Sequence, residues 1–140
     1  MKRCLPFLWC LIAACDLFGP RSRLAELEAN EARWLAAEVH DYDFDYQVIA
    51  MAWFPPVTVE VRHDLVTRVV NRDTQAEIAV AGWPTIDSLF VMTRRDLGLP
   101  DYKIDITYDA QYHFPAVVSG DLPHAADREF TRRAEKVRKQ

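Results

Sequence analysis

The feature that most constrains the fold is a strict alternation of apolar and polar residues in short runs. In DYDFDYQV, which starts at Asp41, aromatic or aliphatic side chains alternate with acidic or amide ones. After Pro55-Pro56, the run VTVEVR from Val57 to Arg62 repeats the pattern. A period of two puts all the apolar side chains on one face of a strand. The sequence therefore predicts neighbouring strands of an antiparallel sheet with one buried face and one wet face.

Other parts of the chain show the boundary signals of further strands and two helices. Helices are expected from Ser22 to about His40 and from a Thr85 cap to Gly98, since serine and threonine favour N-caps and glycine favours helix ends. The last element, about 128–137, fits the spacing of either a helix or a strand. The other strands are expected at Leu65–Asn71 after a turn at His63-Asp64, at Ala76–Ala81, at Tyr102–Tyr108 and at Phe114–Ser119.

Apolar residues at helical spacing indicate which helix faces enter the core. In the first helix they are Leu24, Leu27, Trp34 and Leu35, and in the second they are Ile86, Leu89, Phe90 and Leu97. These spacings place each set near one face of its helix. We expect the largest members, Trp34 and Phe90, to anchor the two helices in the core.

Two segments of the chain are each similar to a second segment that lies 60 residues further on. DYDFDY at Asp41 pairs with DYKIDI at Asp101, and FPPV at Phe54 pairs with FPAV at Phe114. Each half also reads as a helix followed by strands, so one interpretation is a tandem repeat of a helix and about three antiparallel strands. The alternative is chance similarity between two strands. Either way, we predict an α+β fold with two layers, in which two helices cover one face of an antiparallel sheet.

The N-terminus predicts export and a lipid anchor. Lys2 and Arg3 precede a mostly apolar run of about eleven residues, which is typical of a signal peptide and shorter than the roughly 20 residues that span a bilayer. The run ends Ile12-Ala13-Ala14-Cys15, which resembles a bacterial lipobox. That resemblance implies removal of residues 1–14, a diacylglyceryl group on Cys15, a tether over 15–21 and a single domain over 22–140. The alternatives are a plain signal peptide with a chance cysteine, or a buried N-terminal helix.

The positions of the other two cysteines are consistent with export. Cys4 and Cys10 would leave with the signal, so no free thiol would remain in an oxidising envelope. Asp16, directly after the lipidated cysteine, predicts sorting to the periplasmic face of the inner membrane if the source has two membranes. The expected location is the bacterial cell envelope, and the first expected partner is the membrane itself.

The charge balance disfavours nucleic acid as a partner. Without Lys2 and Arg3 the chain has 15 basic and 21 acidic residues, a formal net charge of −6. Basic residues gather only near the C-terminus, at Arg128, Arg132, Arg133, Lys136, Arg138 and Lys139. We interpret this segment as a solvated edge, and the alternative is contact with anionic lipid head groups near the anchor.

No familiar catalytic or metal-binding pattern is present. The acidic run Asp41, Asp43 and Asp45 fails as a calcium loop, because Tyr46 stands where the loop needs glycine and Ala52 where it needs glutamate. The three carboxylates are instead expected to be solvated on one face of a strand. The four histidines also lack the spacing of a zinc helix. We therefore expect no cofactor, no metal ion and no catalytic residue.

Two functions from different classes remain open. The leading hypothesis is a non-enzymatic binding or accessory domain, with Trp53, Tyr112 and His113 as a candidate contact surface for an envelope protein or peptide. The alternative is a hydrolase or metal-dependent enzyme that uses His113, Asp109 and His124. Convergence of the last three side chains in one pocket would favour the enzyme.

From about Trp34 to Val137 the chain resembles a bacterial family, the domain-of-unknown-function 6174 family. The stretches DYDFDYQ, TIDSLF, ITYDAQYHFPAVV and HAADREFT carry this resemblance. Members look like exported or lipid-anchored proteins, and the resemblance implies no particular activity. It also favours a strand for the last element.

The chain departs from the family pattern at three places. Ala52 and Phe54 stand where the family often has two cysteines, which removes any disulfide or redox role there. His113 replaces a glycine, and His63-Asp64 replaces an Asp-Gly turn. Because glycine tolerates positive φ far better than histidine does, the resemblance leaves the backbone geometry of these turns open.

Overall fold

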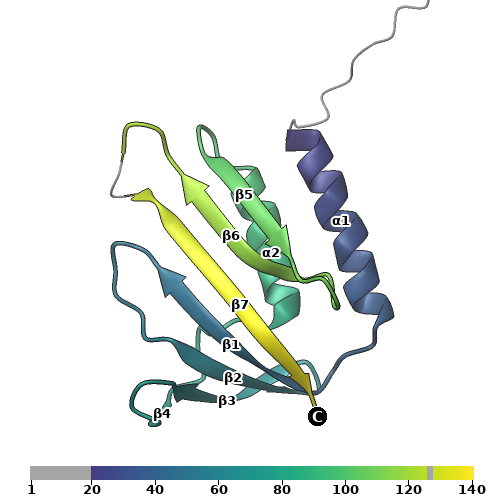
Figure 1. The fold of residues 1–140 in the computed structure, drawn as a ribbon, viewed down its shortest axis with the longest axis vertical. Coiled ribbons are helices and arrows are strands. Elements are labelled where there is room, and N and C mark those ends of the chain that lie inside the picture. Colours follow the sequence, from purple (N-terminus) through teal and green to yellow (C-terminus); the bar gives the residue numbers. More distant parts are fainter. Residues whose placement is uncertain (1–19, 126–127) are drawn as a thin grey trace, which may run out of the picture.

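A computed structural model (Figure 1) describes residues 20–125 and 128–140. The helices are α1 (Pro20–Ala36) and α2 (Ile86–Leu97). The strands are β1 (Tyr42–Ile49), β2 (Val57–Arg62), β3 (Leu65–Asn71), β4 (Glu77–Ile78), β5 (Lys103–Tyr108), β6 (Pro115–Asp121) and β7 (Phe130–Lys139). The predicted strands are all present, and the ambiguous last element is confirmed as a strand.

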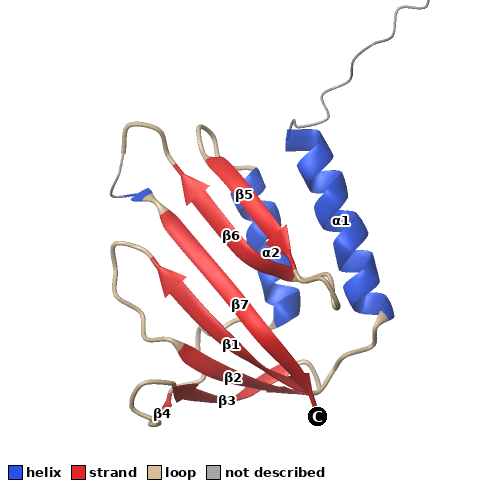
Figure 2. Cartoon of the chain, viewed as in Figure 1, coloured by secondary structure: helices blue, strands red, loops and turns tan. Residues whose placement is uncertain are grey.

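All seven strands form one antiparallel sheet in the order β4-β3-β2-β1-β7-β6-β5 (Figure 2). The first and last strands, β1 and β7, lie side by side in its centre and pair from Tyr42–Lys139 to Ile49–Thr131. Figure 1 looks onto the sheet with α2 behind it. The described residues contain no helix that is long and apolar enough to cross a membrane.

The predicted two-layer α+β fold is wrong, and so is the interpretation of the chain as a tandem helix-plus-three-strand repeat. The protein is dominated by a single seven-stranded sheet, and the proposed equivalents do not occupy equivalent positions in it. Strand β1 is central, whereas its sequence counterpart β5 is an edge strand. Phe54 is 42% exposed while its counterpart Phe114 is fully buried. The similarity at 60 residues therefore reflects strand composition, because alternating strands before a proline look alike in any sheet.

The ends of α2 follow their capping residues closely, whereas α1 (Pro20–Ala36) differs from the expected Ser22 to about His40 at both ends. At α2, the Thr85 hydroxyl oxygen accepts a hydrogen bond from the Ser88 backbone N–H at 3.1 Å, and the Gly98 N–H donates to the Arg95 carbonyl. Both predicted caps are confirmed. Helix α1 begins at Pro20, two residues before the predicted Ser22 and within the predicted tether, because proline suits a first helical turn.

Aromatic side chains dominate the core beneath the helices. Trp34 is 2% exposed and Phe90 is fully buried, so both predicted anchors are confirmed. The Trp34 ring makes edge contacts with three aromatic rings, those of Tyr42, Tyr112 and Phe114, with ring centres 5.5, 6.4 and 6.1 Å away. Leu35, which was assigned to the same face, is 59% exposed instead. Near the end of a helix, one residue step of 100° moves a side chain off the buried stripe.

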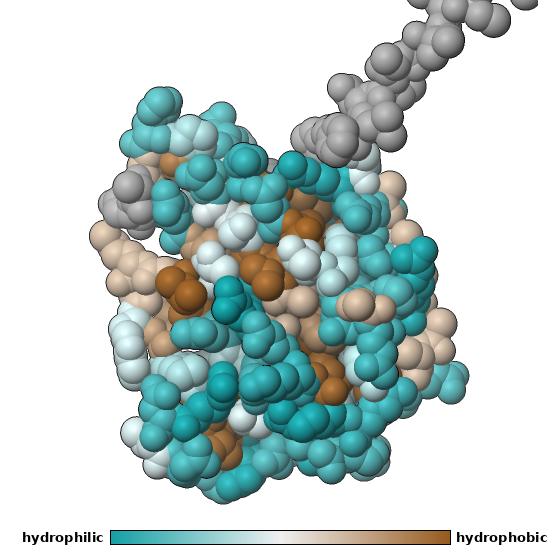
Figure 3. All heavy atoms as spheres, in the orientation of Figure 1, coloured by the Kyte–Doolittle hydropathy of each residue, from teal (hydrophilic) through white to brown (hydrophobic). Residues whose placement is uncertain are grey.

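The opposite face of the sheet is covered by charged side chains rather than helices. Figure 3 shows this face as mostly hydrophilic, with scattered hydrophobic patches. Asp45 lies here but is only 8% exposed, so the prediction that it is solvated is wrong. Its carboxylate accepts a hydrogen bond from Thr58 and lies 3.3–3.7 Å from nitrogen atoms of three cations: Arg72, Lys136 and Arg138.

The charge balance around Asp45 decides its ionisation. Burial works to raise the pKa of the Asp45 carboxyl, but hydrogen bonds from Thr58 and Arg138 and the charge of Arg72 outweigh it and hold the pKa below its usual range. The acidic run thus belongs to a network of ion pairs across the open face. This role explains why carboxylates recur in β1 without the geometry of a calcium loop.

Positive φ angles occur at the turns where the family pattern has glycine. His63 and Asp64 have φ angles of 52° and 64°, and His113 has a φ angle of 64°. The predicted turn at His63-Asp64 is confirmed as the β2–β3 hairpin. Hydrogen bonds accompany this left-handed conformation: the His63 N–H donates to the distant Asp41 carboxylate, and the His113 N–H donates to the Asp109 carbonyl within its own turn.

Candidate functional site

Two cavities lie between α2 and the sheet and share Val48 and Arg132 as a common wall. We call them the apolar lobe and the polar lobe. The apolar lobe, about 470 Å³, is lined by Tyr46, Val48, Phe54, Ala81, Gly82, Trp83, Met92 and Arg132. The polar lobe, about 310 Å³, is lined by Val48, Arg95, Asp96, Leu99, Tyr102, Phe130 and Arg132. These sizes lie at the lower end of the range for small-molecule sites.

Arg132 separates the lobes because it lies on the core-facing side of β7. It pairs with Val48 of β1, and its side chain is 11% exposed. The guanidinium forms an ion pair with Asp96 of α2, whose side chain is 6% exposed, and lies 4.8 Å above the Phe130 ring. Burial lowers the pKa of Arg132, and the charge of Arg95 lowers it further.

The Arg132 side chain has donor capacity to spare. Its Nε atom is buried and has no hydrogen-bond partner among the described residues. An arginine carries five N–H donors, and a buried donor without a partner is costly to the fold. Such groups occur where a ligand or water completes the hydrogen bonding. The lobes therefore meet at a buried cation that can accept a further partner.

The apolar lobe lies beside an exposed hydrophobic loop. We call residues 50–56, which join β1 to β2, the β1–β2 loop. Its Met51, Trp53 and Phe54 side chains are 76%, 78% and 42% exposed, and Ile49 at the end of β1 is 53% exposed. Phe54 also lines the apolar lobe. Neighbouring exposed apolar side chains of this kind are typical of interaction sites.

The groups that line both lobes favour an apolar, anionic partner. Burial raises the pKa of the Tyr46 hydroxyl to about 12, so this wall of the apolar lobe is uncharged at neutral pH. In the polar lobe, two arginines, Arg95 and Arg132, face one acid, Asp96. Their formal charges leave one positive charge in excess. Arg95 is exposed, so that charge is reachable from solvent.

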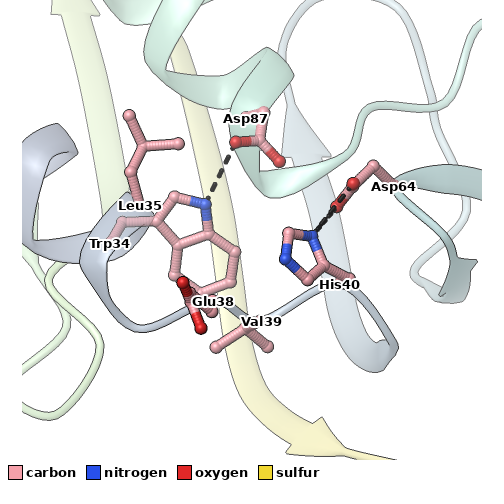
Figure 4. Close-up of a pocket in the computed structure, with 7 residues that line it drawn as sticks. All are labelled: Trp34, Leu35, Glu38, Val39, His40, Asp64 and Asp87. Atoms are coloured by element: carbon pink, nitrogen blue, oxygen red, sulfur yellow. Dashed lines mark hydrogen bonds and ion pairs between the residues drawn. The ribbon is translucent and has the colours of Figure 1, made fainter.

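A third cavity, about 300 Å³, lies at the C-terminal end of α1 (Figure 4). It is lined by Trp34, Leu35, Glu38, Val39, His40, Asp64 and Asp87. Two of its carboxylates already have partners. The Trp34 indole N–H donates to Asp87 at 3.2 Å, and His40 Nδ1 lies 3.0 Å from both Asp64 oxygens. This cavity therefore contains interactions that join α1 to α2 and the segment between α1 and β1 to the β2–β3 turn.

The His40–Asp64 pair makes stability depend on pH. The hydrogen bond to Asp64 and its charge raise the pKa of His40 above 6.5. Because the folded pKa is the higher one, the pair contributes fully below the unfolded pKa and its contribution is lost as pH rises through the folded pKa. In urea titrations between about pH 6 and pH 9, we expect the wild-type midpoint to fall more than that of His40→Gln.

Asp64→Asn is the matched control for this pH effect, because it removes the negative charge that stabilises the protonated imidazole and keeps the histidine. It should flatten the same part of the pH profile. The effect should be small, since both side chains are more than half exposed and solvent screens the pair. Parallel profiles for wild type and His40→Gln would contradict this prediction.

The structure does not bring the predicted contact residues together. Trp53 lies in the β1–β2 loop, at the end of the sheet where Ile49 pairs with Thr131. Tyr112 and His113 lie in the β5–β6 turn, at the other end of β7, where the Lys139 ammonium is 5.3 Å from the Tyr112 ring centre. Tyr112 also packs on Trp34 as part of the core. Of these residues, Trp53 alone lies in the loop beside the cavities.

The residues of the enzyme hypothesis are also separated. Asp109 shapes its own turn, because its carboxylate accepts hydrogen bonds from the N–H groups of Gln111 and Tyr112. His113 follows in that turn, whereas His124 lies beyond the far end of β6. Among residues 20–125 and 128–140, no group of three or more His, Cys, Asp or Glu side chains could hold a metal ion.

Sequence reasoning missed Arg132 as a site residue, and the predicted lipid site is not described. If the last element is a strand, Phe130, Arg132 and Ala134 lie on the same face. The two apolar neighbours on that face could have indicated that Arg132 is buried. The helix interpretation hid it. Cys15 and Asp16, assigned to lipidation and sorting, lie outside the described residues.

Comparisons with known proteins give a family but no close relative of known activity. Searches of curated proteins and of solved structures returned no match. Residues 26–139, which include every residue that lines the two lobes, match a family of unknown function, DUF6174. The chain therefore belongs to the DUF6174 family.

Proposed function

We propose that this protein is a lipid-anchored, non-enzymatic binding domain of the bacterial cell envelope. The observation that carries the binding role is the pair of lobes around the buried Arg132, open beside the exposed β1–β2 loop. An apolar cavity with a few convergent polar groups is the usual form of a small-ligand site. The anchor is supported by the lipobox-like residues that end at Cys15 and by the short apolar run before them.

The lipid anchor would hold the domain near the membrane. Few residues separate Cys15 from Pro20, where α1 begins, and an extended chain spans about 3.5 Å per residue at most. A diacylglyceryl group supplies the two chains that stable membrane binding requires. The domain would then sample amphiphilic molecules at the membrane surface, with the β1–β2 loop as a hydrophobic contact.

The anchor is tested by fractionation of cells that express wild type or Cys15→Ser. We expect wild type in the membrane fraction, with a diacylglyceryl group on the N-terminal peptide in mass spectrometry, and no such modification in Cys15→Ser. Asp16→Ser tests sorting, because it should move the lipoprotein to the other membrane in a two-membrane source. A soluble wild-type protein with an unmodified Cys15 would overturn the anchor.

The binding role is tested with N-phenylnaphthylamine, a neutral dye that fluoresces in apolar surroundings. Saturable binding is expected in wild type and should be lost in Met92→Trp, which fills the apolar lobe. Val91→Trp is the matched control, since Val91 is the neighbouring helix residue and is 62% exposed. Circular dichroism checks that both variants fold. Absent binding, or equal binding by wild type and a folded Met92→Trp, would overturn this site.

A further inference from the structure

The division of the cavity constrains what can occupy it. The apolar lobe presents uncharged side chains along Tyr46, Trp83 and Met92, and the polar lobe presents an excess positive charge. Val48 and Arg132 border both, so one molecule that passes them would contact both environments. A ligand that matches this arrangement has an apolar end and an anionic end.

The available donors favour a carboxylate as the anionic end. Arg132 already pairs with Asp96, but its buried Nε has no hydrogen-bond partner among the described residues. A planar guanidinium matches the geometry of a carboxylate, and hydrogen bonds between charged groups are stronger than neutral ones. Arg95, in the same lobe, offers a second and exposed cation. A cationic head group would meet two arginines and would be repelled.

We propose that the divided cavity binds a single-chain amphiphile with a terminal carboxylate, with the chain in the apolar lobe and the carboxylate between Arg132 and Arg95. This inference rests on the proposed binding function and specifies its ligand. The partly exposed Phe54 side chain lines the apolar lobe where such a chain would enter, and it would shield the chain from water.

The test compares three twelve-carbon probes that differ only at the head group. Dodecanoate, dodecan-1-ol and dodecylamine compete with N-phenylnaphthylamine at pH 8, below the micelle concentrations of the two ionic probes and below the solubility limit of the alcohol. The protein is the full chain with Cys15→Ser, which keeps every cavity residue and cannot be acylated. We expect dodecanoate to bind about tenfold more tightly than the alcohol, since its head group gains charge-assisted hydrogen bonds, and we expect dodecylamine to bind most weakly.

Two arginine variants locate the head group. Arg95→Gln should weaken the binding of dodecanoate severalfold and leave the binding of dodecan-1-ol unchanged, and the exposed position of Arg95 makes the substitution compatible with the fold. Arg133→Gln is the matched control: it removes the same charge from the opposite face of β7, where Arg133 pairs with Gln47. The double variant Arg132→Gln/Asp96→Asn removes the buried pair together and should abolish the preference for dodecanoate over the alcohol.

The outcomes separate this inference from the proposed function. If the dye binds in the apolar lobe but dodecan-1-ol competes as well as dodecanoate, the carboxylate is overturned and the binding function stands. An Arg95→Gln protein that retains full preference for dodecanoate also overturns it. Failure of wild type to bind the dye overturns the proposed function and this inference together.

Discussion

Trp34→Ala is expected to lower the free energy of unfolding by about 3–5 kcal/mol, which is the usual cost of removing a large buried aromatic side chain. Trp34 is 2% exposed and packs edge-on against three aromatic rings that come from β1 and the β5–β6 segment. Its indole also donates to Asp87 at the start of α2. The substitution would therefore leave a cavity where α1, α2 and the sheet meet.

Leu35→Ala is the matched control for Trp34→Ala. The two residues are adjacent in α1, but Leu35 is 59% exposed and should cost little, since exposed sites rarely change stability by more than about 0.5 kcal/mol. Urea denaturation of both variants and wild type measures the difference. A loss below about 1 kcal/mol for Trp34→Ala would mean that Trp34 does not anchor α1.

Asp96→Ala is expected to cost about 3–5 kcal/mol, because it leaves the buried guanidinium of Arg132 without its partner. Both side chains are nearly buried, at 11% and 6% exposure, so the substitution breaks a buried ion pair rather than a surface one. The same substitution at Glu77, which pairs with Arg68 on the exposed face, should cost no more than about 1 kcal/mol. Chemical denaturation at neutral pH measures both.

The double variant Asp96→Leu/Arg132→Met distinguishes the cost of an unpaired buried charge from the contribution of the ion pair itself. When a buried ion pair is replaced by apolar residues of similar size, stability is often unchanged or higher. We therefore expect the double variant to be more stable than Asp96→Ala. Equal losses in Asp96→Ala and Glu77→Ala would contradict the assignment of a buried pair.

Local sequence signals were sufficient for most of the individual elements, but not for the last one, whose spacing fitted both a helix and a strand. The alternation around Tyr42 and Val57 predicted β1 and β2, and the caps Thr85 and Gly98 predicted the ends of α2. These features succeed because side-chain period and capping depend on neighbours within a few residues. The matched family covers the same region, so local pattern and family agree on what the chain contains.

The sheet order and the cavity could not be predicted, because both depend on which distant strands become neighbours. The similarity at 60 residues suggested two equal halves, yet β1 and β7 pair in the centre and β5 lies at an edge. That pairing brings Val48 and Arg132 side by side and sets Arg132 against Asp96 of α2. Within their own sequence segments, nothing about Arg132 or Asp96 indicates that the two side chains form a buried pair.

The sequence by itself determined that two helices and the first six strands are present, together with the turn at His63-Asp64 and the anchors Trp34 and Phe90, since these follow from local periodicity and from the size of apolar side chains. The tertiary structure alone decided the rest. It buried Asp45 beneath three cations, separated Trp53 from Tyr112 and enclosed Arg132 between two lobes. The physical reason is that burial of a charge depends on partners supplied by other strands, and the pairing of strands far apart in the chain fixes those partners.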